Sequence, residues 1–491
     1  FDVLFSRQTI EPLLLSLRLG LSVSIGAAAV GTVLAWLTIR TDLPGRKLWQ
    51  VLCPLPLVLP SFVAAAAIIS AFGPGGMLES ILEPLGVENL PSMRTFWGAW
   101  VVLTLITYPY VYLPVAARLA GLPPSLEESA RMLGRTSLAS FREVIWPQTV
   151  GAVRAGALLA FLYTISDFGA VTLLGQRVLT TRIYASRLAD RPLSLALSLV
   201  LGIAAIAIVM LERRTAPEEL RTAAASTARG GHTSLGRWRW AASLIPAFVL
   251  FVSVIGPLAV LVWWAEKGLS SGAAGFTSVG GGLGSLWIPT WNSVRVSILA
   301  AIVATLLIFP IAWLTVRYKS RLAGSLNGVV LMGFALPGLV IALAMVFMAL
   351  NVPLLSSLYQ TITLLILAYV VHFGGQSLRT AQVAVVSLSP QLEEAAQTLG
   401  ARRIRRLLRI ELPILAPGLA AGAGLVLLST MKELPASLLV SPAGFETLSV
   451  RIWDATNEGF LTEAAIGSLL LVAVSGLLTW ILILRQIDRF D

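Results

Sequence analysis

The sequence predicts an all-α protein that crosses a membrane many times. Hydrophobic residues make up 56% of its 491 residues and charged residues only 12%, whereas a soluble domain carries about 25% charged residues. Apolar stretches of about 20 residues, the length that a helix needs to cross a bilayer core, recur along the chain. The alternating strands of about 10 residues that are typical of an outer-membrane barrel are not visible. These observations favour a polytopic helical membrane protein.

The basic net charge is explained by membrane topology. It amounts to +11, but the Lys and Arg residues lie in short loops between apolar stretches, as is typical of membrane proteins. The single cysteine, Cys53, excludes a disulfide or a cysteine metal site within the chain. No cleavable signal peptide is visible. We therefore expect a lipid bilayer around the protein and no nucleic-acid partner.

The chain contains 11 expected spans. The second contains Pro54, Pro56 and Pro60, which predict a kinked or broken helix. Residues 73–95 are rich in Gly, Pro and Glu and predict a loop with a short surface helix. The spans are expected at residues 13–39, 51–72, 97–119, 151–175, 193–211, 241–265, 293–316, 327–350, 361–380, 415–440 and 466–485.

The two parts of the chain repeat each other. Residues 16–18 match 293–295, and Leu59-Pro60 matches Leu336-Pro337, both 277 residues apart. Further along, equivalent residues are 266 apart, and the longer loop at 73–95 accounts for the difference. Equivalent segments must face the same side of the membrane, so the duplication is parallel.

The repeat predicts a domain organisation. It consists of a first half at residues 1–215, an Arg-containing cytoplasmic linker at 216–240 and a second half at 241–491. The span at 241–265 has no partner in the first half. We therefore expect one more helix upstream of Phe1, which would give two homologous halves of six helices each.

Two charged segments interrupt the apolar pattern at equivalent positions. Leu126–Pro147 and Leu392–Pro413 each contain a Glu pair, a glycine at which a helix can turn, and a terminal proline. Loops on the side of these segments carry 24 Lys and Arg residues against 8 on the other side, so the segments are predicted to be cytoplasmic. From composition alone, such a segment either docks in a groove of a soluble partner or lies on the lipid surface.

The spacing within these segments resembles the signature loop of permeases of binding-protein-dependent ABC importers. The second copy matches it in full at Glu394, Ala395, Ala396, Gly400, Ile410, Leu412 and Pro413, and the first departs from it at Ser129, Val144 and Trp146. The resemblance implies the type I permease fold in a prokaryotic inner membrane. It also implies a periplasmic binding protein and two copies of a cytoplasmic ATPase, which bind ATP and Mg and receive the coupling loops. The coupling residues carried over are Glu128, Ala130, Leu133, Gly134, Arg135, Pro147, Glu394, Ala395, Ala396, Leu399, Gly400, Ala401 and Pro413.

The chain itself is expected to be a transport subunit and not an enzyme. It has no Gly-x-x-x-x-Gly-Lys-Ser/Thr loop to hold a nucleotide, so ATP hydrolysis is assigned to partner subunits. His232 and His372 form no sequence pattern of a metal or acid–base cluster. We expect no cofactor in this chain.

Polar residues at membrane depth are candidates for the translocation pathway because they are costly there. The candidates are Ser166, Asp167, Lys432 and Glu433. Asp167 and Glu433 are 266 residues apart and so equivalent, and both are candidate transient metal ligands. In the alternative interpretation, Lys432 and Glu433 pair with neighbours and stiffen a helix break at Pro435.

The cargo is the least determined feature. The segments 166–170, 432–435 and 446–453 resemble those of the ferric-iron group of fused permeases, which implies iron(III) as the substrate. Thiamine, polyamine, phosphonate and oxyanion import remain alternatives. A secondary transporter is a less favoured class, and a membrane-embedded enzyme is disfavoured because only two histidines are present.

Overall fold

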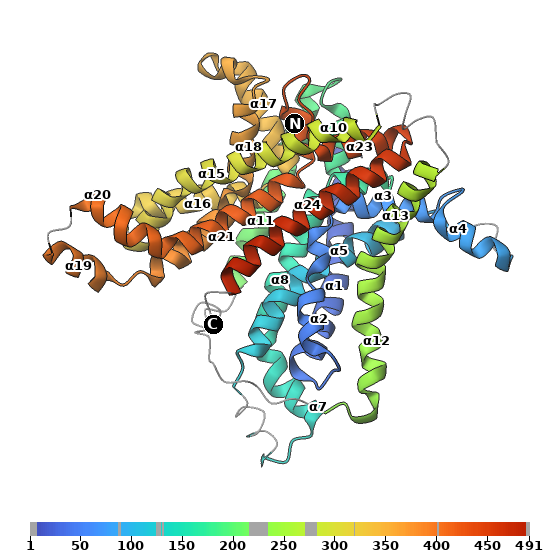
Figure 1. Ribbon diagram of the computed structural model, residues 1–491, viewed down its shortest axis with the longest axis horizontal. Coiled ribbons are helices and arrows are strands. Elements are labelled where there is room, and N and C mark those ends of the chain that lie inside the picture. Colours follow the sequence, from blue (N-terminus) through green and yellow to red (C-terminus); the bar gives the residue numbers. More distant parts are fainter. Residues whose placement is uncertain are drawn as a thin grey trace. The chain divides into compact units, whose positions relative to one another are not determined.

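The computed structural model describes residues 7–86, 90–123, 129, 132–215, 234–270, 282–318, 320–399 and 402–487, whose regular elements are helices (Figure 1). Of the helices described, 10 are long and apolar enough to cross a membrane, or up to 11 if one bent pair counts as a single span. The prediction of an all-α polytopic membrane protein is therefore confirmed. The expected helix upstream of Phe1 stays a prediction.

The chain divides by its internal contacts into two compact units, Phe1–Glu266 and Lys267–Asp491. The helix that begins the predicted second half therefore packs within the first unit: Val249 contacts the buried cluster of that unit. The division by packing thus differs from the division at residue 240 by repeat. Most of the predicted linker, residues 216–233, lies outside the described residues.

The first unit is built around long helices α1 and α5. A Cβ atom on Gly31 of α1 would lie 2.7 Å from the carbonyl oxygen of Tyr108 on α5, so a small residue is needed where the two helices cross. Its elements are α1 (Arg7–Arg40), α2 (Arg46–Leu52), η1 (Leu55–Val58), α3 (Ser61–Phe72), α4 (Met77–Leu82), η2 (Glu83–Leu85), α5 (Phe96–Ala120), α7 (Ser137–Ser140), η3 (Phe141–Ile145), α8 (Trp146–Ser166), α9 (Gly169–Leu173), α10 (Leu179–Ser186), α11 (Arg191–Thr215), η5 (Gly236–Trp238), α12 (Arg239–Leu250), η6 (Phe251–Ile255) and α13 (Gly256–Ser270), the last of which crosses the boundary between the units.

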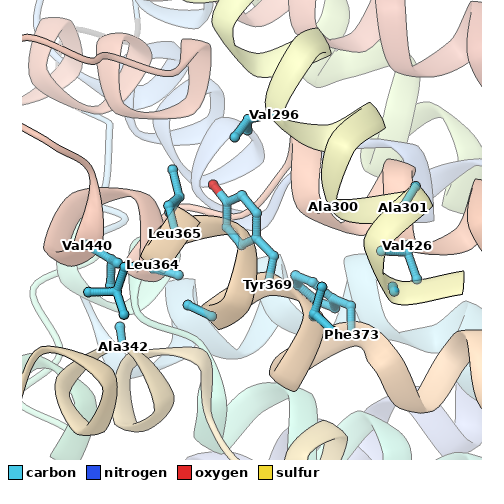
Figure 2. Close-up of a cluster of buried hydrophobic side chains, with 14 of the residues drawn as sticks. Val296, Ala300, Ala301, Ala342, Leu364, Leu365, Tyr369, Phe373, Val426 and Val440 are labelled. Carbon is cyan, nitrogen blue, oxygen red and sulfur yellow. The ribbon is translucent and has the colours of Figure 1, made fainter. Parts of the chain in front are cut away.

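The second unit has a buried cluster around Tyr369. Figure 2 shows its ring beside Phe373 and its hydroxyl on the side of Leu365 and Val296. Its elements are η7 (Gly282–Leu286), α15 (Trp287–Arg317), α16 (Arg321–Ala335), α17 (Gly338–Asn351), η8 (Pro353–Leu358), α18 (Ile362–Ser387), α19 (Pro390–Thr398), α20 (Arg403–Arg406), η9 (Leu407–Glu411), α21 (Leu412–Met431), α22 (Pro435–Val440), α23 (Leu448–Glu458) and α24 (Leu461–Ile487).

Three predicted spans are interrupted in the structure. The span expected at 151–175 ends at Ser166, and the span expected at 415–440 ends at Met431. In each case a short helix, α9 or α22, follows after a break. The span expected at 327–350 is the pair α16 and α17, bent by 112°. Proline at position 337 explains this bend, because it has no N–H for the helical ladder. The predicted break in the second span is confirmed, since α2, η1 and α3 replace one helix there.

The repeat is visible in individual hydrogen bonds within each unit. Arg40 donates to the carbonyl oxygen of Leu122 at 3.3 Å, and its equivalent Arg317 donates to that of Leu388 at 2.8 Å. The same holds for serine hydroxyls. Ser16 accepts from the backbone N–H of Leu179 at 2.9 Å, and Ser293 accepts from that of Leu448 at 2.7 Å.

One contact that occurs in both units pairs a large residue with a small one in one unit, and two residues of intermediate size in the other. In the first unit, the Ser61 hydroxyl at the start of α3 donates to the Asp167 carboxylate. Its equivalent in the second unit is Gly338, where a Cβ atom would lie 2.6 Å from Oε1 of Glu433. The longer acidic side chain of the second unit thus fills the volume that the serine takes in the first. We conclude that the two pairs are matched in volume.

We predict that Gly338→Ser destabilises the chain by about 1–3 kcal/mol, the usual cost of overpacking. Adding Glu433→Asp, which recreates the serine–aspartate pair of the first unit, should recover most of the loss. The measurement is the thermal unfolding midpoint of the purified chain in detergent.

Gly324→Ser serves as the control for this pair of variants. A Cβ atom on Gly324 of α16 meets nothing within 4 Å, so its substitution should leave the midpoint unchanged or raise it. A double variant that is no more stable than Gly338→Ser alone would contradict the volume matching.

Candidate functional site

Two turn segments lie at the ends of the long helices α8 and α21, and we define them as residues 132–147 and 390–413. The first contains α7 and η3 and leads into α8. The second contains α19, α20 and η9 and leads into α21, beyond whose end α19 and α20 lie in Figure 1. Of the predicted coupling residues, Glu128, Ala130, Gly400 and Ala401 lie outside the described residues.

In the described part of the first segment, the chain turns at Gly134. Gly134 has a φ angle of 80°, the left-handed conformation that favours glycine. Both segments enter the membrane helix through one π-helical stretch, η3 or η9, that ends before the Trp146-Pro147 or Leu412-Pro413 pair. Pro147 and Pro413 are therefore the second residues of α8 and α21, directly after the π-helical stretch.

Each turn segment presents one leucine almost fully to solvent. The exposed fraction is 82% for Leu133 and 88% for Leu399, and the two residues are equivalent in the repeat. Ala396 is buried, whereas Glu394 is exposed. Removing such an exposed apolar side chain from water is favourable, so a partner that covers it would bind more tightly.

The segments are braced by ion pairs that the sequence analysis missed. Arg135 Nε lies 3.3 Å from Oε2 of Glu143, with both side chains about half exposed. Arg406 Nε donates to Oε1 of Glu411 at 2.5 Å, and the Glu411 residue is only 2% exposed. A buried pair holds its geometry more firmly than an exposed one, because breaking it leaves an uncompensated charge. In the sequence, the buried pair could have been suspected from Glu411, the single acidic residue that follows five arginines.

The second group of candidate residues lies at the two helix breaks. At the break after α8, Asp167 accepts the backbone N–H of Val171 on Oδ1 at 3.2 Å, and the Ser61 hydroxyl on Oδ2. The Thr180 hydroxyl donates to the carbonyl oxygen of Asp167 at 2.7 Å. The carboxylate thus caps α9 and ties it to α3.

The break after α21 is built in the same way. Glu433 accepts the backbone N–H of Ala436 on Oε1 at 3.2 Å, and its carbonyl oxygen accepts the Ser437 hydroxyl at 2.7 Å. That hydroxyl is also 2.6 Å from the Tyr369 hydroxyl, which joins the break to the buried cluster. Ser166 and Lys432, the last residue of α8 and the residue after α21, are half-buried.

The structure gives both predicted carboxylates a bracing position. Asp167 is 8% exposed and Glu433 is 9% exposed, and each already accepts protein hydrogen bonds. Within the described ranges, no three His, Cys, Asp or Glu side chains are grouped so that they could hold a metal ion. Sequence reasoning missed Ser61 and Gly338. The signal for both was their position directly after the matching Leu-Pro pairs.

Comparisons with known proteins agree with this geometry. The model of the family described as "binding-protein-dependent transport system inner membrane component" matches residues 27–212 and again residues 304–490. The two matches contain the two turn segments and the two breaks. The fused two-half organisation inferred from the repeat is thereby confirmed.

Curated relatives include permeases for different substrates. The chain is 31% identical to the Fe(3+)-transport system permease protein FbpB 2 of Haemophilus influenzae, over 98% of this chain and 91% of that protein. It is 30% identical to the sulfate transport system permease protein CysT of Escherichia coli over 36% of this chain and 63% of that one. It is 32% identical to a probable molybdenum ABC transporter permease protein of Haloferax volcanii, over 38% of this chain and 68% of that one. The chain belongs to the family of inner membrane components of binding-protein-dependent transport systems, as a fused permease of the ferric-iron-like group.

Proposed function

We propose that this ABC importer permease forms the route by which iron(III), delivered by a periplasmic binding protein, crosses the inner membrane. Two ATPase subunits dock on the two turn segments and supply the energy, and they bind the ATP and Mg. The observation that carries this proposal is the pair of exposed leucines, Leu133 and Leu399, at equivalent turn positions. The excess of Lys and Arg on this side supports a cytoplasmic location of both segments.

The choice of iron rests on the extent of one similarity. The Fe(3+) permease aligns with nearly the whole chain, whereas the sulfate and molybdenum permeases align with less than two fifths of it. An oxyanion is the second candidate because of those relatives. The candidate residues at the breaks carry two acids against one base, Lys432, and this net negative charge favours a cation over an oxyanion, since like charges repel.

The binding protein is proposed to dock on the side opposite the turn segments. There, Arg177 before α10 and Glu446 before α23 are exposed and stand at equivalent positions with opposite charge. On α23, burial raises the pKa of the Asp454 carboxyl, and Glu446 and Glu458 raise it further while Arg451 opposes them. A partner with two different lobes would match such unlike surfaces.

We predict that Leu133→Asp combined with Leu399→Asp lowers uptake by at least about tenfold, because covering a leucine contributes about 1.5–3 kcal/mol to docking. The measurements are uptake in cells and recovery of the ATPase with the purified permease. Leu354→Asp is the matched control for ATPase recovery, because Leu354 in η8 is 85% exposed at the opposite helix ends. Normal ATPase recovery with the double variant would contradict the docking role.

For the breaks, we predict that Asp167→Asn combined with Glu433→Gln lowers iron uptake about tenfold while the unfolding midpoint stays unchanged. The amide oxygens still accept the capping hydrogen bonds, but the negative charges that attract a passing cation are lost. An attraction worth about 1.4 kcal/mol in the rate-limiting step corresponds to tenfold in rate.

The matching neutral substitution Glu11→Gln, at an exposed residue of α1 outside both breaks, is the control for this variant. Unchanged iron uptake in the double variant would remove Asp167 and Glu433 from the pathway. A lowered midpoint together with lowered uptake would assign them a structural role only.

We predict that cells lacking this chain lose the uptake of radioactive iron(III) by at least about tenfold, and that the chain restores it from a plasmid. Uptake of radioactive sulfate and molybdate should be unchanged, because the oxyanions carry the opposite charge to the proposed cargo. Loss of sulfate or molybdate uptake with normal iron uptake would contradict the assignment and favour the oxyanion alternative.

A further inference from the structure

Asp42 joins two segments of the first unit that are far apart in the sequence. Its Oδ1 accepts the backbone N–H of Leu235 at 2.7 Å, and its Oδ2 lies 3.4 Å from the Ser234 hydroxyl. The loop between α1 and α2 is thereby fixed to the residues that lead into η5 and α12. Asp42 uses its carboxylate in this junction.

The junction brings two pairs of basic residues into one region. Arg46 and Lys47 begin α2, just after the loop that leaves α1, and Arg237 and Arg239 follow the Leu235 contact. Lys47 and both arginines of the second pair are exposed, and Arg46 is half-buried. A hollow of about 590 Å³ lies beside the first pair and is lined by Asp42, Leu43, Gly45, Arg46 and Lys47. The Asp42–Leu235 hydrogen bond thus holds the two segments that carry these four basic residues together.

Large apolar side chains alternate with these charges. Trp238 is 66% exposed and Trp240 is 65% exposed, next to Arg237 and Arg239. On α2, Leu48 and Val51 are also largely exposed. Tryptophan and arginine side chains in alternation are typical of the headgroup level of a bilayer, where a ring stays in the apolar boundary and a charge reaches the phosphates.

The path of the chain places this region on the side of the first turn segment. Arg40 at the end of α1 donates to the carbonyl oxygen of Leu122, two residues beyond the end of α5, the helix that precedes that segment in the chain. Asp42 is two residues beyond Arg40. The basic residues therefore lie at the membrane face that is predicted to be cytoplasmic, where anionic lipids attract Lys and Arg.

We propose that Arg46, Lys47, Arg237 and Arg239 bind the phosphate headgroup of an anionic phospholipid. A lipid headgroup and a free phosphate would both offer a phosphate anion to these residues. We favour the lipid, because its acyl chains would cover the exposed tryptophans and the apolar side chains of α2, whereas a free phosphate would leave them exposed. The bound lipid bridges the α1–α2 loop and the start of α12 across the Asp42 junction.

The test is native mass spectrometry of the full chain in detergent, titrated with phosphatidylglycerol. Arg237→Gln combined with Arg239→Gln should weaken binding about 30-fold, or roughly fivefold for each positive charge lost near an anionic headgroup. Phosphatidylcholine should bind weakly to both proteins. Soluble glycerol phosphate should not compete at the concentration that saturates phosphatidylglycerol.

Arg177→Gln combined with Arg191→Gln is the control, because both arginines are exposed and lie at the opposite helix ends. This variant should bind phosphatidylglycerol like the unmodified chain, and both variants should unfold at the same temperature in phosphatidylcholine. Unweakened binding by the Arg237 and Arg239 variant would overturn the proposal. Equal binding of glycerol phosphate and of the intact lipid would also overturn it.

Discussion

Capping of broken helices by a carboxylate is the interaction on which the rest of this structure depends. A helix that begins again after a break inside a membrane protein leaves its first backbone N–H groups without partners, and lipid offers none. Asp167 and Glu433 fill this need by accepting the N–H of Val171 and of Ala436. Because each acid also reaches the start of α3 or α17, one side chain fixes both the break and the packing of its neighbour.

The two halves of the chain cap their broken helices with different pairs of residues. Ser61 with Asp167 and Gly338 with Glu433 fill comparable volumes, so neither half can change one member alone without strain or a void. Arg40 and Arg317, by contrast, make the same contact in both halves. Each donates to a carbonyl oxygen after the neighbouring helix. The halves therefore share a backbone design while their buried side chains have diverged in matched pairs.

Most of the architecture was predictable, because it follows from the length of the apolar stretches and from the internal repeat of the sequence. Apolar length identifies the spans, and repeat offsets identify equivalent residues such as Leu133 and Leu399. The end of α8 was not predictable, since Phe168 continues the apolar pattern past the break. The break before α22 was foreseen only in the alternative interpretation, from Pro435. The role of Ser61 depends on a contact with a residue 106 positions away, and no local pattern reveals such a contact. Likewise, Glu411 looks like a surface acid until its burial is known.

The two turn segments carry equivalent leucines on unequal supports, and this has a mechanical consequence. In the second segment the brace is the buried Arg406–Glu411 pair, while the first relies on the exposed Arg135–Glu143 pair. Separating the buried pair leaves a charge away from water, whereas water readily solvates the exposed pair after separation. The same push on Leu399 and on Leu133 would therefore deform the first segment more. The second segment would pass a larger share of the displacement into its membrane helix, α21.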